Sequence, residues 1–133
     1  MNFSLVAIRF SGDVETNPGP FNFEVKECRT RGLKICHLNV RSLLPKVDSL
    51  RLFISKNPLD VIAVSETWLK PSTTNAETDI PNYSISRNDR ANKSGGGTSF
   101  YVRNGLPFRT RGHLQSSHIE TCWIEKKKKK TKS

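Results

Sequence analysis

Between residues 33 and 68 the chain consists of two continuous apolar runs separated by a segment of mixed character. The first run, Leu33–Val40, is short and mostly apolar, and polar residues and a glycine flank it, which is typical of a buried strand. The second run, Asp60–Glu66, is rich in Val, Ile and Ala and has the same character. We therefore predict two buried strands in this part of the chain.

Apolar residues in the segment between the two runs recur at helical spacing, which predicts an amphipathic helix. Pro45 suits its first turn, where a backbone N–H is not needed, and Ser42 is placed to cap it. The helix is expected to end before Asn57-Pro58. Two buried strands joined by a helix favour a parallel pair with a right-handed crossover. The apolar side consists of Leu44, Val47, Leu50 and Ile54, with Leu43 and Phe53 beside them, and the polar side of Lys46, Asp48, Ser49, Arg51 and Lys56.

Two polar residues stand at the carboxyl ends of the predicted strands, Asn39 on the first and Glu66 on the second. Ligands in open α/β sheets gather outside the carboxyl ends of strands. A carboxylate that ends a buried strand is costly unless it is paired or binds a metal, and Mg²⁺ prefers one or two carboxylates together with substrate phosphates and water. A glutamate that simply faces solvent is the ordinary alternative, and spacing alone leaves both interpretations open.

The second half of the chain predicts further strands, around Tyr83–Ser86 and at Thr98–Val102, followed by a turn at Asn104-Gly105. The glycines Gly95–Gly97 are not followed by Lys-Ser/Thr or by a helix, so we interpret them as a source of backbone freedom and not as a phosphate-binding loop.

Two packing roles are also expected, in addition to a last strand. Tyr101 is interpreted as a core residue, and Cys36 likewise lies in an apolar strand. The last strand is expected within Ile119–Glu125, with Trp123 and Ile124 directed toward a core.

A basic loop lies between the predicted strands of the second half. Arg87, Arg90 and Lys93 are candidates for contact with DNA phosphates, which fix position and not sequence, and a solvated loop is the alternative. The chain as a whole carries a formal charge of +10, but six of these charges come from the tail lysines, so the body is only mildly basic. A basic surface favours nucleic acid or an anionic membrane without choosing between them.

Cysteine usage and hydropathy exclude several classes of protein. The three cysteines are odd in number and lack metal-ligand spacing, which argues against a disulfide framework and a zinc finger. No apolar run approaches the roughly 18 residues that a membrane helix needs, so we predict no membrane partner. Ser4–Phe10 is too short for a secretory signal, which favours an intracellular protein in either the nucleus or the cytoplasm. The oligomeric state is left open.

The residues Gly12–Pro20 read GDVETNPGP, which on composition alone is a turn or a linker. The string resembles the 2A-like ribosome-skipping peptides, whose pattern is D-V/I-E-x-N-P-G-P. The resemblance implies a junction formed by Asn17, Pro18, Gly19 and Pro20, where the ribosome forms no peptide bond between Gly19 and Pro20 and then resumes synthesis. Proline is a constrained, slow nucleophile, which is consistent with such an arrest.

Three blocks of the sequence carry a second resemblance. They are Leu38–Leu43, Ser65–Leu69, and Arg87–Arg90 together with Gly95–Val102. They resemble the endonuclease–exonuclease–phosphatase superfamily, and more closely the endonuclease of non-LTR retrotransposon polyproteins, over roughly Leu33 to Glu125. The resemblance implies an α/β fold, the N-terminal part of a four-layer α/β/β/α sandwich. It also implies Mg²⁺-dependent nicking of DNA, with Glu66 as the metal ligand and Asn39 as a contributor to the phosphate and metal site.

The resemblance also divides the chain into regions. Residues 1–20 correspond to the skipping peptide, 21–32 to a linker with an edge strand at Phe21–Val25, 33–125 to the endonuclease-like domain and 126–133 to a lysine-rich tail. The later aspartates and the Ser-Asp-His motif of the family are not among the 133 residues, which implies a truncated domain with little or no activity. The alternatives are a non-enzymatic basic fragment that binds nucleic acid non-specifically and a functionless translated relic.

The skipping motif gives a direct prediction. Cell-free translation of the chain with a reporter on each side of the Gly19-Pro20 junction should yield two separate products. Pro20→Ala should restore one fused product, because alanine lacks the constrained ring. A single fused product from the unmodified sequence would refute skipping.

Overall fold

The computed structural model describes residues 3–7, 32–115 and 120–127 of the chain. Several predictions concern residues outside these ranges. They include the skipping motif, the edge strand expected at Phe21–Val25 and the tail from residue 128 onward.

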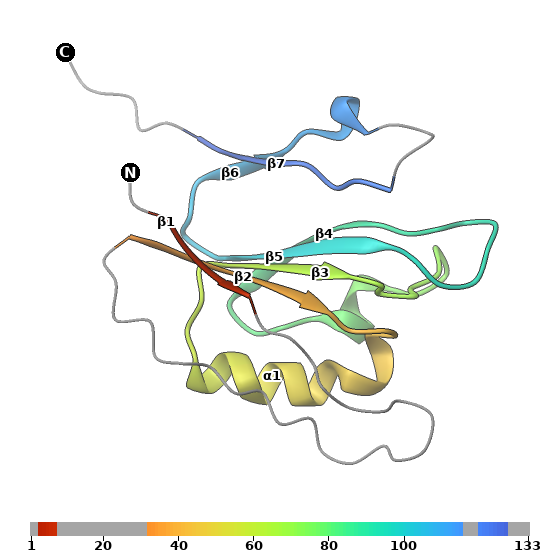
Figure 1. Ribbon diagram of the computed structural model, residues 1–133, viewed down its shortest axis with the longest axis horizontal. Helices are drawn as coiled ribbons and strands as arrows, with labels where there is room; N and C mark the ends of the chain where they lie inside the picture. The colour runs from red at the N-terminus through yellow and green to blue at the C-terminus, as the bar shows by residue number, and fades with distance from the viewer. Residues whose placement is uncertain (1–2, 8–31, 116–119, 128–133) are drawn as a thin grey trace.

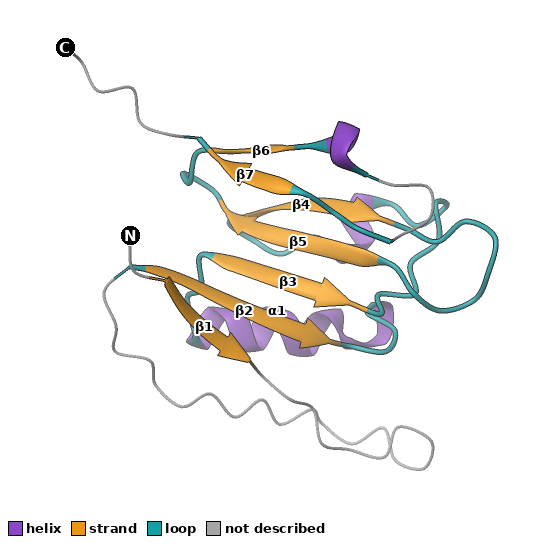
Figure 2. Cartoon of the chain, turned by 45° about the horizontal axis from the view of Figure 1, so that its top comes forward, coloured by secondary structure: helices purple, strands orange, loops and turns teal. Residues whose placement is uncertain are grey.

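A five-stranded mixed sheet forms the centre of the molecule, with strand order β1-β2-β3-β5-β4 (Figure 2). The predicted parallel pair is confirmed, because β2 and β3 run parallel with Cys36 opposite Ile62 and Asn39 opposite Ser65. β3 and β4 both pair with β5 in the antiparallel sense. The strands span Phe3–Ala7 (β1), Leu33–Asn39 (β2), Val61–Ser65 (β3), Tyr83–Asn88 (β4) and Thr98–Arg103 (β5).

Strand β1 was not predicted from the sequence. It pairs parallel to β2, with Phe3 opposite Leu33 and Ala7 opposite His37, and it forms one edge of the sheet. This short apolar segment of five residues, FSLVA, was not assigned a strand from its own sequence. The pairing partner, which lies about thirty positions further along the chain, is what makes this segment a strand.

Helix α1 spans Val47–Lys56 and covers one face of the sheet (Figure 1). A 3-10 turn at Leu44–Lys46 precedes it, with Pro45 in its first positions as expected. The helix ends before Asn57, also as expected. Ser42 does not cap the turn, because the capping position belongs to Leu43 and no side chain bonds there. Four apolar side chains of α1 are buried, each worth about 1.5–3 kcal/mol, namely Val47, Leu50, Phe53 and Ile54.

Lys46 contradicts the prediction that it lies on the polar side of the helix. Its residue is only 7% exposed, and its Nζ donates hydrogen bonds to the carbonyl oxygens of Val40 and Arg41, the latter at 2.8 Å. Burial, and then the charge of Arg41, lower the pKa of the Lys46 amine. The long side chain therefore turns inward to bind backbone carbonyls just beyond the end of β2.

Two short strands lie on the side of the sheet opposite α1 (Figure 1). β6 (Phe108–Thr110) pairs antiparallel to β7 (Ile124–Lys126), and a 3-10 turn at Gly112–Leu114 follows β6. The predicted last strand therefore exists in a shorter form that begins later. The prediction that Trp123 points to a core is wrong, because this residue is 46% exposed.

The described residues thus form three layers: α1, the five-stranded sheet and the β6–β7 pair. The mixed α/β class is confirmed, whereas the four-layer sandwich stays a prediction. The expected core roles of Cys36 and Tyr101 are confirmed, since both are buried, and burial raises the pKa of the Cys36 thiol to about 12. In the described part of the chain, no helix has the length and apolar character required to cross a membrane.

The burial of Lys46 predicts a specific loss of stability. Lys46→Met keeps the apolar part of the side chain but removes the donor for two carbonyls, so the free energy of unfolding should fall by about 1–3 kcal/mol. Urea denaturation measures the change. Lys56→Met, at the exposed end of α1, is the matched control and should change stability little. Equal effects of the two substitutions would contradict the role assigned to Lys46.

Candidate active site

The two predicted site residues lie at the same edge of the sheet. Asn39 is the last residue of β2, and Glu66 directly follows β3, whose last residue, Ser65, is the register partner of Asn39. Backbone pairing continues past both strands, because the amides of Val40 and Ser42 donate to the carbonyls of Ser65 and Glu66 at 3.1 and 2.9 Å. The topology therefore brings the two residues to the ends of neighbouring strands, with Asn39 exposed and Glu66 half-buried.

The backbone at this edge is unusual. Four residues without the freedom of glycine have positive φ, namely Arg41 (41°), Ser42 (80°), Glu66 (55°) and Trp68 (52°). Such conformations cost of order 1–3 kcal/mol each and persist only where surrounding contacts impose them. They cluster at functional sites, so the strand ends stand out from the rest of the fold.

Hydrogen bonds from described residues fix only one of the two oxygens of the Glu66 carboxylate. Its Oε2 accepts hydrogen bonds from the indole Nε1 of Trp68 at 2.9 Å and from the backbone N–H of Gly96 at 3.2 Å. Among the described residues, none donates a hydrogen bond to Oε1. One oxygen is therefore fixed by two donors, and the other is available to a ligand.

Sequence reasoning assigned no role to Trp68. The residue is 44% exposed, and its indole donates a hydrogen bond to the candidate metal ligand. The signal in the sequence is the spacing Glu66-Thr67-Trp68. This spacing indicates a contact between the two side chains only when the positive φ values of Glu66 and Trp68 are known.

The glycines Gly95–Gly97 form the second wall of the site. All three have positive φ, and the carbonyls of Gly96 and Gly97 accept hydrogen bonds from the amides of Trp68 and Thr67 at 2.8 and 3.2 Å. A Cβ at position 97 would lie 2.4 Å from the Thr67 hydroxyl oxygen, so only glycine fits there. This confirms the interpretation of the segment as a source of backbone freedom.

Glu120 is a site residue that sequence reasoning missed. Its Oε2 accepts a hydrogen bond from the N–H of Gly97 at 3.0 Å, and its Oε1 forms an ion pair with Nε of Arg90. The Arg90 bond, and then the Gly97 bond, lower the pKa of the Glu120 carboxyl. The same pair raises the pKa of Arg90. Arg90, predicted to contact DNA, is thus engaged within the protein.

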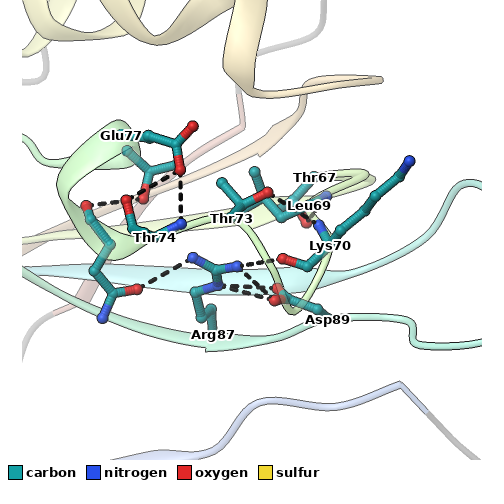
Figure 3. A network of polar contacts seen from close by, with 10 residues as sticks. Thr67, Leu69, Lys70, Thr73, Thr74, Glu77, Arg87 and Asp89 are labelled. Atoms are coloured by element: carbon teal, nitrogen blue, oxygen red, sulfur yellow. Dashed lines mark hydrogen bonds and ion pairs between the residues drawn. The ribbon is translucent and has the colours of Figure 1, made fainter.

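Arg87 is engaged more completely, as Figure 3 shows. Its guanidinium donates to the Asp89 carboxylate at 2.6–3.0 Å, to the Asn75 side chain at 3.2 Å and to the Lys70 carbonyl at 2.9 Å. Its side chain is only 12% exposed. These bonds tie β4 to the loop after Trp68, which favours a structural role for Arg87. Lys93 is exposed, and contact between these residues and DNA stays a prediction.

The donor set suits a hard divalent cation. A carboxylate oxygen of Glu66 and the amide oxygen of Asn39 are oxygen ligands of the kind that Mg²⁺ takes, and Mg²⁺ commonly keeps several waters with only one or two protein carboxylates. Across residues 32–115 and 120–127, no three His, Cys, Asp or Glu side chains gather into a ready-made metal site. The residues present fit an ion held by one carboxylate and completed by water and phosphate.

Two comparisons with known proteins bear on this arrangement. The sequence model of the Endonuclease/Exonuclease/phosphatase family matches residues 36–131, which include Asn39, Glu66 and Glu120. The fold resembles the crystal structure of AP endonuclease LMAP from Leishmania major, with 28% sequence identity and a TM-score of 0.53. The likeness covers 65% of this chain and 30% of that one, so the chain spans about a third of the solved protein. Among curated proteins no sequence matches this chain.

The bond between Trp68 and Glu66 predicts a spectroscopic signature. In ¹H–¹⁵N spectra, Glu66→Ala should move the indole resonance of Trp68 upfield, because the proton loses its acceptor, and should leave that of Trp123 in place. Glu66→Gln, which keeps an acceptor oxygen, should move it less. Trp68→Phe assigns the resonance. If the indole resonance of Trp68 does not move in Glu66→Ala, the result would contradict the hydrogen bond between Trp68 and Glu66.

Proposed function

The chain belongs to the Endonuclease/Exonuclease/phosphatase family, and from that premise we propose that its strand-end site binds Mg²⁺ and the phosphodiester backbone of DNA. The observation that carries the proposal is the Glu66 carboxylate, fixed through Oε2 and open at Oε1, beside Asn39 at the carboxyl edge of two parallel strands. Members of the family are generally metal-dependent.

Each residue has a defined task in this proposal. Glu66 offers Oε1 to the ion, while Trp68 and Gly96 keep Oε2 in place and so limit rotation of the carboxylate. Asn39 offers its side-chain amide to the ion or to a phosphate oxygen from the neighbouring strand end. A bound Mg²⁺ supplies Lewis-acid stabilisation of the charge that develops on the phosphate and the leaving oxygen.

We infer a narrower identity from the sequence blocks, namely a retrotransposon-type endonuclease with the four-layer sandwich of that group. The AP endonuclease likeness supports a DNA substrate, and the Asn39, Glu66 and Gly95–Gly97 blocks support the retrotransposon branch. The ribosome, as the partner of the skipping motif, belongs to the same proposal. The family's general base is not among the 133 residues, so we expect these residues alone to nick DNA slowly or not at all.

Metal binding is therefore the sharper test. Mn²⁺, used as a paramagnetic substitute for Mg²⁺, should broaden the backbone resonances of Trp68 and Gly96 and the indole resonance of Trp68, and excess Mg²⁺ should reverse the effect. Glu66→Ala should abolish this broadening. Glu77→Ala, which removes an exposed carboxylate from the 3-10 turn at Asn75–Thr78, is the matched control and should leave it intact.

Plasmid nicking in the presence of Mg²⁺ complements the binding measurement. Any nicking observed should disappear in Glu66→Ala and persist in Glu77→Ala. Mn²⁺ broadening at the strand ends that persists in Glu66→Ala would contradict the proposed site. Nicking that persists in Glu66→Ala would contradict it as well.

A further inference from the structure

We propose that Arg90 and Glu120 are positioning residues, which fix the glycine turn and, through it, the carboxylate of Glu66. The metal-binding part of this inference rests on the proposed function, whereas the positioning itself rests on contacts within the protein. In the described part of the chain neither residue hydrogen-bonds to Glu66 or Asn39. Their effect passes through Gly96 and Gly97 and through the charge of the pair.

A continuous series of contacts leads from Glu66 through the glycine turn to Glu120 and Arg90. The N–H groups of two consecutive glycines bond two different carboxylates, Gly96 to Glu66 at 3.2 Å and Gly97 to Glu120 at 3.0 Å. Glu120 in turn pairs with Nε of Arg90, whose Nη1 lies 3.4 Å from the carbonyl of Ser94, at the start of the turn. The turn is thus bonded both to Glu66 and to the Arg90–Glu120 pair.

Close packing leaves the turn little room to shift. A Cβ placed on Gly96 would lie 2.5 Å from both Cζ of Arg90 and Oε2 of Glu120, which shows how closely the ion pair packs against the backbone. On the neighbouring side, a Cβ on Gly95 would lie 3.5 Å from the indole nitrogen of Trp68. Displacement of the ion pair would therefore be transmitted to both donors that hold Oε2 of Glu66.

Charge gives the pair a second effect. The turn has two carboxylates beside it, and an unpaired Glu120 would repel Glu66 and compete with it for a cation. The ion pair neutralises Glu120 and leaves Glu66 as the carboxylate that is free to take the ion. Consistent with this arrangement, the pKa of Arg90 is raised mainly by its bond to Glu120, with a smaller contribution from the charge of Glu66.

The Arg90–Glu120 pair and the glycine turn join distant parts of the chain. Glu120 lies shortly before β7 and 54 positions after Glu66, whereas Arg90 lies just beyond β4. The segment that leads into β7 thus completes the support of a site whose candidate ligands stand at the carboxyl ends of β2 and β3. Positioning partners of this kind tune metal affinity by about 10- to 100-fold in proteins.

Mn²⁺ affinity and the Trp68 indole resonance test the proposal together. Glu120→Ala should weaken Mn²⁺ binding about 10-fold and should move the Trp68 indole resonance in the metal-free protein. Arg90→Ala should also move the Trp68 resonance, and the double variant should move it little further, because the pair acts as a unit. Glu120→Gln keeps an acceptor for Gly97 without the charge, so it should lose less affinity than Glu120→Ala, and it serves if the alanine variant does not fold.

Glu125→Ala is the matched control. Glu125 forms exposed ion pairs with Arg109 and Arg111 in the same part of the chain but does not contact the turn, so its removal should change neither readout. Normal Mn²⁺ affinity and an unmoved Trp68 resonance in Glu120→Ala, with affinity lost in Glu66→Ala, would overturn the positioning role and leave the proposed function standing. Normal affinity in Glu66→Ala would refute the proposed function, and the Trp68 resonance in Glu120→Ala would then decide the positioning role alone.

Discussion

The arrangement of the site depends on the segment Glu66–Trp68, which backbone hydrogen bonds hold on both sides. On one side the amides of Ser42 and Leu43 donate to the carbonyls of Glu66 and Thr67, and on the other the amides of Thr67 and Trp68 donate to the glycine turn. These bonds impose the left-handed backbone at Glu66 and Trp68, which would otherwise be unfavourable. Within this segment the indole Nε1 of Trp68 donates a hydrogen bond to Oε2 of Glu66 at 2.9 Å.

Periodicity and strand-end chemistry were enough to predict the framework. The β2–α1–β3 unit, the parallel pair and the positions of Asn39 and Glu66 follow from apolar runs and from the Pro45 and Asn57-Pro58 boundaries, all of which are local signals. The backbone freedom of the glycine turn was also predictable, because three consecutive glycines stand directly before a strand. Local signals were sufficient here because burial in the core against α1 determines which positions of β2, α1 and β3 are apolar.

The errors have other physical origins. Lys46 is polar by composition but buried, because its amine reaches carbonyls that only the folded chain presents. Trp123 is apolar but exposed, and it lies directly before the short strand β7. Glu120 gave no signal, since its partners Arg90 and Gly97 lie 30 and 23 positions away. Such pairings over long sequence separations are set by tertiary structure, and no pattern within a window of the sequence encodes them.

The proposed skipping at Gly19-Pro20 would have a consequence for strand β1. It lies on the N-terminal side of the Gly19-Pro20 junction, whereas its partner β2 lies on the other side. A missing peptide bond at that junction would turn an intramolecular pairing into an association between two molecules, which would lose the high effective concentration that a covalent link provides. The edge of β2 would then be open to any strand that can pair with it, in the manner of donor-strand exchange.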